Sequence, residues 1–169
     1  MKKNNLTFIS CDANYNEANI VLFGAPFDGT TSFRPGTRFA PNQIRIDSDG
    51  IETYSPYLDI DLDDKSIIDV GDVEFPFGNV QKTLDEIEKM TTSIINDNKK
   101  PIMIGGEHLV TLPQVSALSK KYNNIHIIHF DAHADLRDHY LDEKLSHATV
   151  MKRCFDILGK DSISQFGIR

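Results

Sequence analysis

The chain has 169 residues, of which 40% are hydrophobic and 25% charged, and its formal net charge is −7. This length suits one domain with a real core, and the acidic balance disfavours nucleic acid and anionic membranes as partners. Two cysteines, Cys11 and Cys154, are too few for a disulfide framework, and no apolar stretch could serve as a signal core or span a bilayer. We therefore expect a cytoplasmic protein with buried or incidental thiols.

Short apolar runs that end in glycine or proline predict strands, in chain order at residues 19–24, 66–70, 102–104, 125–130 and 162–168. Amphipathic spacing predicts helices from a cap at Asn79 to Lys99 and Lys100, over residues 109–121, and from His147 to Gly159. A long loop is expected over residues 25–41, and residues 44–57 are ambiguous. Strands alternating with helices indicate an α/β fold with a parallel sheet and helices on both faces.

The segment Phe130-Asp131-Ala132-His133-Ala134-Asp135 follows the 125–130 run, which we expect to be a buried strand. If the chain stays extended, Asp131, His133 and Asp135 project together from the carboxyl end of that strand, where open α/β sheets bind ligands. Their oxygen and nitrogen donors suit a hard or borderline divalent ion such as Mn²⁺. The alternative is a polar loop with a helix-capping Asp.

The segment Gly105-Gly106-Glu107-His108 ends the preceding predicted strand. Two glycines permit a tight turn, so His108 is expected at the same sheet edge as Asp131. By contrast, His126 and His129 lie within the 125–130 run. We expect them to be packed, hydrogen-bonded histidines that lie deeper than the ligand triplet.

Together these motifs resemble those of the ureohydrolases, the arginase-like manganese enzymes. The 105–108 segment looks like their first metal motif, which more often has Asp where Glu107 stands, and residues 129–135 match the second. Residues 32–41 resemble the loop after the first strand in agmatinase-type members, and Ser146-His147-Ala148-Thr149 is similar to their Ser-His-Gly-Thr segment. The resemblance implies that residues 1–169 form a single three-layer arginase-like α/β domain, here incomplete, with about five strands.

The resemblance also implies a function: hydrolysis of the guanidino group of agmatine to putrescine and urea by a hydroxide held between two Mn²⁺ ions. By the same resemblance, His108, Asp131 and Asp135 hold one ion, and Asp131 and His133 share in the second. Asp135 and His147 then act as catalytic proton carriers. The implied partners are a small cationic guanidino substrate and further copies of the chain, in a trimer or hexamer.

Other residues near these motifs are open to two interpretations. Arg34 and Arg38 are expected to position their loop or a subunit contact, because a guanidinium repels a cationic substrate. Glu107 either supports a neighbouring ligand or is a substitution without consequence.

The family pattern also requires further acidic ligands in an Asp-x-Asp segment on a later strand, which would have to lie beyond Arg169. We therefore expect an N-terminal portion that by itself binds metal weakly, turns over little, and pairs or aggregates through an exposed sheet edge. Three alternatives stay open: another substrate (arginine, guanidinobutyrate or formiminoglutamate), a deacetylase of the same fold with one zinc ion, and a non-catalytic interaction fragment.

Overall fold

Three parallel strands form the centre of the computed structural model, which describes residues 6–169; the first five residues of the predicted irregular N-terminus lie outside this range. β1 (Ile20–Ala25) lies between β4 (Ile67–Asp72) and β5 (Lys100–Gly105), with parallel pairing on both sides. After Ile20 every residue of β1 is buried, as the uninterrupted apolar run requires of a strand covered on both faces. Strands were predicted at all three places.

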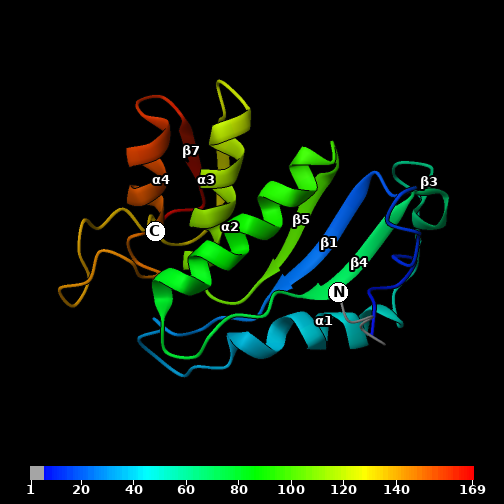
Figure 1. The fold of residues 1–169 in the computed structure, drawn as a ribbon, viewed down its shortest axis with the longest axis horizontal. Helices are drawn as coiled ribbons and strands as arrows, with labels where there is room; N and C mark the ends of the chain where they lie inside the picture. Colours follow the sequence, from blue (N-terminus) through cyan, green and yellow to red (C-terminus); the bar gives the residue numbers. More distant parts are fainter. Residues whose placement is uncertain (1–5) are drawn as a thin grey trace.

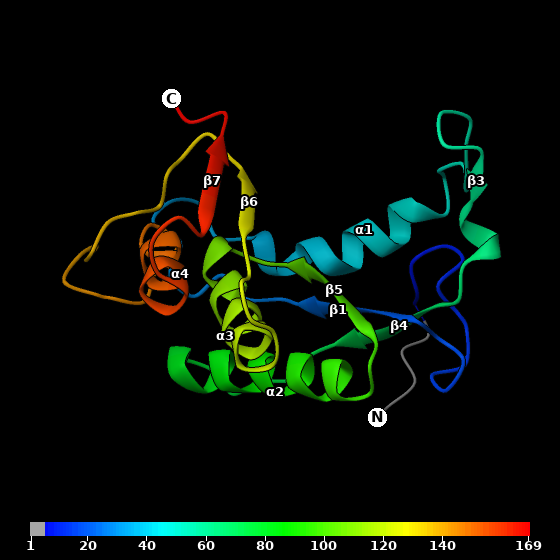
Figure 2. The ribbon, with the colours of Figure 1, turned by 90° about the horizontal axis from the view of Figure 1, so that it is seen from above.

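Helices cover both faces of this sheet, as the alternation of elements predicted. α1 (Ala40–Ser48) lies over one face, and α2 (Val80–Asn96) and α3 (Thr111–Lys121) lie over the other (Figures 1 and 2). The Asn79 side chain accepts a hydrogen bond from the Lys82 backbone N–H at 2.9 Å, which confirms the predicted cap.

The end of α2 differs from the expectation. The helix stops at Asn96, and Lys100 already belongs to β5. Lys99 Nζ instead donates to the Ala18 carbonyl oxygen at 2.6 Å. Lys99 and Lys100 therefore lie beyond the end of α2, and the prediction that the helix extends to them was wrong.

α1 lies where the sequence predicted the end of a loop and an ambiguous segment. Its side toward the protein carries Arg45, which is fully buried and donates to Asp69 Oδ2 at 2.7 Å and to Asp72 Oδ1 at 2.6 Å. A helix that buries a charge has no apolar stripe, so hydrophobic spacing could not reveal it. The ion pairs fasten α1 to β4.

The remaining parallel strands form a separate pair. β6 (Ile127–Phe130) pairs with β7 (Ile163–Phe166), and α4 (Val150–Leu158) precedes β7 in the chain. In the described part of the chain, the five predicted parallel strands form two separate sheets, β4-β1-β5 and β6-β7. Figure 2 shows the β6–β7 pair beside the central sheet and running across it.

β6 is buried on one face only, which corrects the expectation of a buried strand. Ile127 and His129 face the protein, whereas Ile128 is 63% exposed and Phe130 79% exposed. His126 precedes the strand and is exposed, with Nε2 2.9 Å from Ser164 Oγ, so the prediction that it packs in the interior was wrong.

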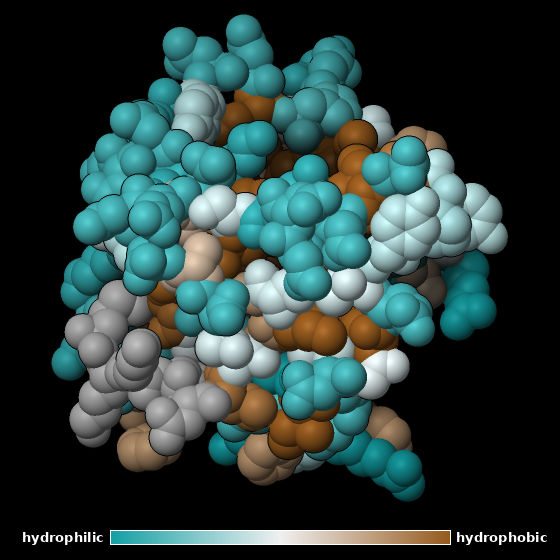
Figure 3. All heavy atoms as spheres, turned by 90° about the vertical axis from the view of Figure 1, so that its right-hand side faces the viewer, coloured by the Kyte–Doolittle hydropathy of each residue, from teal (hydrophilic) through white to brown (hydrophobic). Residues whose placement is uncertain are grey.

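Shorter elements complete the described chain. Two two-residue strands, β2 (Tyr54–Ser55) and β3 (Ile60–Asp61), form an antiparallel pair beside the acidic segment 59–64. Single 3₁₀ turns occupy Thr37–Phe39, Leu62–Asp64 and His108–Val110. Polar side chains cover much of the end of the molecule where the strands begin (Figure 3). No helix of residues 6–169 is long and apolar enough to cross a membrane.

Both thiols are free and buried, as expected from the sequence. Burial, helped by the charges of Asp69 and Asp12, raises the pKa of Cys11 to about 11, and burial raises the pKa of Cys154 to about 12. At pH 8 the thiolate fraction is then about one in a thousand or less. We expect no reaction of the native protein with Ellman's reagent at pH 8, measured by absorbance, and full reaction of both thiols in guanidinium chloride. Rapid modification of the native protein would contradict this.

Candidate metal centre

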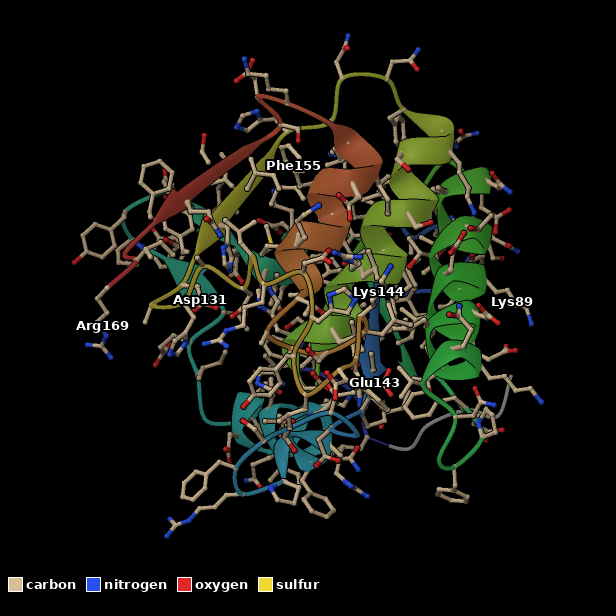
Figure 4. All side chains as sticks on the ribbon, turned by 90° about the vertical axis from the view of Figure 1, so that its left-hand side faces the viewer. Lys89, Asp131, Glu143, Lys144, Phe155 and Arg169 are labelled. Carbon is tan, nitrogen blue, oxygen red and sulfur yellow. The ribbon has the colours of Figure 1, made fainter. Side chains whose placement is uncertain are left out.

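The two sequence motifs lie at the carboxyl ends of two strands that are consecutive among the main strands of the chain, one in each parallel sheet. Gly106-Glu107-His108 comes directly after β5, and Asp131 comes directly after β6. A cleft of about 820 Å³ opens there, and its lining includes all five of the predicted site residues: His108, Asp131, His133, Asp135 and His147. Figure 4 looks onto this end of the molecule, with Asp131 just beyond β6.

The structure brings the four predicted ligand side chains together. His108 Nδ1 lies 2.6 Å from Asp135 Oδ2 and 3.9 Å from Asp131 Oδ2. On the other side of the Asp131 carboxylate, His133 Nδ1 lies 3.3 Å from Oδ1. The Asp131 carboxylate thus lies between the two imidazoles, with one oxygen toward each ring.

The backbone reaches this arrangement by a different route from the one the sequence suggested. The strand ends at Phe130, and the His133 N–H donates to Asp131 Oδ1 at 2.8 Å, which makes a local turn. Asp135 has φ 49°, a left-handed conformation that Asp tolerates better than most residues. Simple alternation of an extended chain was therefore the wrong reason for the convergence.

His129 is closer to the candidate ligands than predicted. It is buried, its Nε2 lies 3.4 Å from Asp131 Oδ2, and donor atoms of His108, His129 and Asp131 lie within 4.8 Å of one another. The sequence did contain the signal, because residues two apart on a strand face the same side. The structure thus bears out a hydrogen-bonded His129 but places it beside the ligand triplet, not below it.

A glutamine on β7 orients the His129 ring. The Gln165 amide nitrogen lies 2.9 Å from His129 Nδ1 and donates to the Ala134 carbonyl oxygen at 2.7 Å. Because an amide nitrogen only donates, His129 Nδ1 accepts and Nε2 carries the hydrogen toward Asp131. Within residues 6–169, this buried Nε2 has no hydrogen-bond partner.

The local electrostatics favour an ionised Asp131. Burial opposes ionisation, but the His133 N–H and the neighbouring His108 and His129 outweigh it and hold the pKa of Asp131 below its usual range. An anionic carboxylate among imidazole nitrogens, with no cysteine in the cleft lining, fits a hard or borderline divalent ion. That these residues hold a metal stays a prediction.

A second network joins the same cleft to the loop after β1. The buried Glu107 carboxylate accepts from Thr30 N at 2.9 Å and from Thr30 Oγ1 at 2.5 Å. Thr30 in turn accepts from His147, at Oγ1 from the backbone N–H (3.1 Å) and at the carbonyl from ring Nδ1 (2.8 Å). Thr30 was not predicted as a site residue, and no feature of its residue type or spacing would have identified it.

Gly106 permits the close approach on which these contacts depend. A Cβ at this position would lie 1.9 Å from the Phe27 carbonyl oxygen. The Gly106 N–H donates to the Ala25 carbonyl at 2.9 Å and the Glu107 N–H to the Phe27 carbonyl at 2.7 Å. The end of β5 thus lies against the turn after β1, and only a residue without a side chain permits this approach.

The model of the Arginase family matches residues 18–169. The chain belongs to the arginase family. It is 48% identical over 162 residues to the agmatinase of Bacillus subtilis (strain 168), covering 96% of this chain and 56% of that protein. The crystal structure of a putative agmatinase from Clostridium difficile superposes with a TM-score of 0.90 at 56% identity, and that of the agmatine ureohydrolase of Thermoplasma volcanium with 0.91 at 36%.

These alignments cover 92% and 99% of this chain, respectively, and 56% of each solved chain. The chain therefore spans a little more than half the length of these arginase-family relatives. The shared α/β architecture confirms the predicted fold class.

Both loop arginines contact residues of their own loop. Arg38 forms an ion pair with the buried side chain of Asp28, and this hydrogen bond holds the pKa of Asp28 below its usual range. The Arg34 guanidinium lies over the Phe33 ring, 5.1 Å from its centroid. These contacts agree with the expectation that the two arginines position this loop of the arginase-family chain.

Proposed function

We propose that the protein carrying this chain is an agmatinase, a hydrolase that converts agmatine to putrescine and urea with two Mn²⁺ ions. The observation that carries the proposal is the convergence of His108, Asp131, His133 and Asp135 on one cleft. The similarity to the agmatinase of Bacillus subtilis supports the choice of substrate.

The four side chains would hold the ions, with Asp131 shared between them. Bound divalent ions would lower the pKa of a water molecule and so supply a nucleophile at neutral pH for the guanidinium carbon. The chain's own residues have two further tasks. They accept a proton from the water and return one to the departing amine.

We assign the two proton transfers to Asp135 and His147. Asp135 lies in the cleft with Oδ2 2.6 Å from His108 Nδ1, and its carboxylate can accept the proton that the attacking water loses. His147 donates Nδ1–H to the Thr30 carbonyl, which leaves Nε2 facing the cleft, 3.5 Å from Ser32 Oγ. At Nε2 an imidazole can take up a proton and pass it to the alkylamine.

The test is urea release with added Mn²⁺ from agmatine, arginine, 4-guanidinobutyrate and formiminoglutamate. It uses the longest natural form of the protein that carries this chain. We expect release from agmatine above the others, loss of release after EDTA, and recovery with Mn²⁺. The 169-residue chain alone serves as a comparison, for which we expect weak metal binding and little turnover.

Other outcomes would reject the proposal in distinguishable ways. Preference for another guanidino compound would reject agmatine but keep the ureohydrolase chemistry. A single bound zinc ion with deacetylase activity would reject both, as would a folded, metal-loaded protein that releases no urea. Assembly into a trimer or hexamer is a further proposal, and sedimentation of the same preparation tests it.

A further inference from the structure

We infer that Glu107 is a positioning residue that acts through Thr30 to hold His147 in one tautomer, with ring Nε2 directed into the cleft. This inference deepens the proposed function and rests on it for the catalytic role of His147. Glu107 holds the loop after β1 through hydrogen bonds to Thr30. A single buried carboxylate oxygen, Oε1, accepts both donors of Thr30, the backbone N–H and the hydroxyl.

Thr30 in turn is hydrogen-bonded to His147. The Thr30 hydroxyl uses its hydrogen for Glu107, so toward His147 it can only accept, and it does so from the backbone N–H at 3.1 Å. The Thr30 carbonyl is likewise only an acceptor, so the ring nitrogen 2.8 Å away, Nδ1, must carry the hydrogen. In a neutral imidazole the other nitrogen, Nε2, is then the base.

The Glu107 carboxylate fixes the orientation of Thr30 as well as filling space. Without Glu107, the Thr30 hydroxyl could turn and donate elsewhere, and its backbone N–H would lose a buried acceptor. The strand-end loop would then no longer present its carbonyl to His147 Nδ1 in a fixed place. Loss of a hydrogen-bond partner of a metal-bound histidine typically changes metal affinity or activity by about 10- to 100-fold, and we expect an effect of the same order on activity for His147.

The arrangement also separates His147 from the predicted metal ligands. Thr30 contacts Glu107 and His147, and no hydrogen bond joins it to His108, Asp131, His133 or Asp135 within the described part of the chain. Changing Thr30 should therefore disturb the proton carrier and leave the ions in place. This difference makes the inference testable apart from metal binding.

The experiment compares Thr30→Val, Thr30→Ser, Glu107→Ala and Glu107→Gln in the same natural protein. Valine removes the hydroxyl at almost constant volume, serine retains it, and the glutamine amide oxygen can still accept from Thr30. We expect Thr30→Val and Glu107→Ala to lower kcat by about 10- to 100-fold with KM nearly unchanged, and the two conservative variants to retain most activity. Thr91→Val, which removes a buried hydroxyl bonded to the Ile87 carbonyl in α2, is the matched control.

Two readouts do not depend on turnover. Nitrogen-15 NMR of labelled histidine should show the Nδ1–H tautomer of His147 in the parent protein and in Thr30→Ser, and a mixture of tautomers in Thr30→Val. Mn²⁺ affinity by calorimetry should stay within about twofold in Thr30→Val. If the parent protein releases no urea, the proposed function fails, and the tautomer measurement still decides the positioning role.

Three results would overturn the inference. The first is an unchanged tautomer and an unchanged kcat in a folded Thr30→Val protein. The second is a fall in Mn²⁺ affinity as large as the fall in kcat, which would assign Glu107 and Thr30 to metal binding. The third is an Nε2–H tautomer of His147 in the parent protein. If Glu107→Ala does not fold, Thr30→Val alone decides.

Discussion

Asp131→Asn is expected to abolish urea release and to weaken Mn²⁺ binding by more than about a hundredfold, beyond what loss of a supporting residue gives. The carboxylate stands between His108 and His133, and both of its oxygens are needed if two ions share it. Asparagine keeps the shape but has neither the charge nor the second oxygen. Calorimetric Mn²⁺ titration and the urea assay measure the two effects.

The substitution should leave the fold intact, because the asparagine oxygen can still accept from the His133 N–H. A thermal melt within a few degrees of the parent protein checks this. Asp142→Asn is the matched control, since it changes the same charge at an exposed loop residue whose left-handed conformation (φ 63°) suits asparagine. Undiminished Mn²⁺ affinity in Asp131→Asn would rule out Asp131 as a ligand.

The largest effect on stability is expected from Arg45→Met, which should lower the free energy of unfolding by about 3–5 kcal/mol. The Arg45 side chain and its partner Asp69 are both 0% exposed, and the guanidinium also bonds Asp72. Removing the cation leaves a buried carboxylate without its counter-charge, although methionine fills much of the volume. Denaturant unfolding followed by circular dichroism measures the change.

Lys89→Met provides the comparison for a pair in solvent. The Lys89 side chain is 69% exposed beside Glu86, one turn away on α2 (Figure 4). We expect a far smaller loss there, because an ion pair in solvent contributes little to stability. If the two variants lost equal stability, the buried ion pairs would not be what fastens α1 to the sheet.

The sequence predicted most of the elements, because the apolar runs are stopped by residues that cannot continue a strand. Gly105-Gly106 at the end of β5 is one such stop, and the side-chain cap at Asn79 is a comparable signal for a helix. The helix α1 was not predicted, because Arg45 and not an apolar residue occupies its buried side. The division into two sheets was not predicted, because Ile128 and Phe130 are as apolar as interior residues. The described structure nevertheless leaves both exposed.

The residues of the candidate site that could be predicted are those whose side chains carry metal-binding atoms. His108, Asp131, His133 and Asp135 were singled out by donor atoms and spacing, and the structure places them together. The supporting contacts were not predictable in the same way. Thr30 is an ordinary loop threonine until the fold brings it to Glu107, 77 residues further along the chain.

The close approach at Gly106 has a consequence for protein design. The Gly105-Gly106-Glu107-His108 segment at the end of β5 lies so close to a second backbone that no side chain fits at Gly106. Grafting that segment onto an unrelated parallel sheet would therefore not reproduce the ligand geometry. A graft of this segment would also have to include the turn around Phe27, because the two loops pack directly against each other.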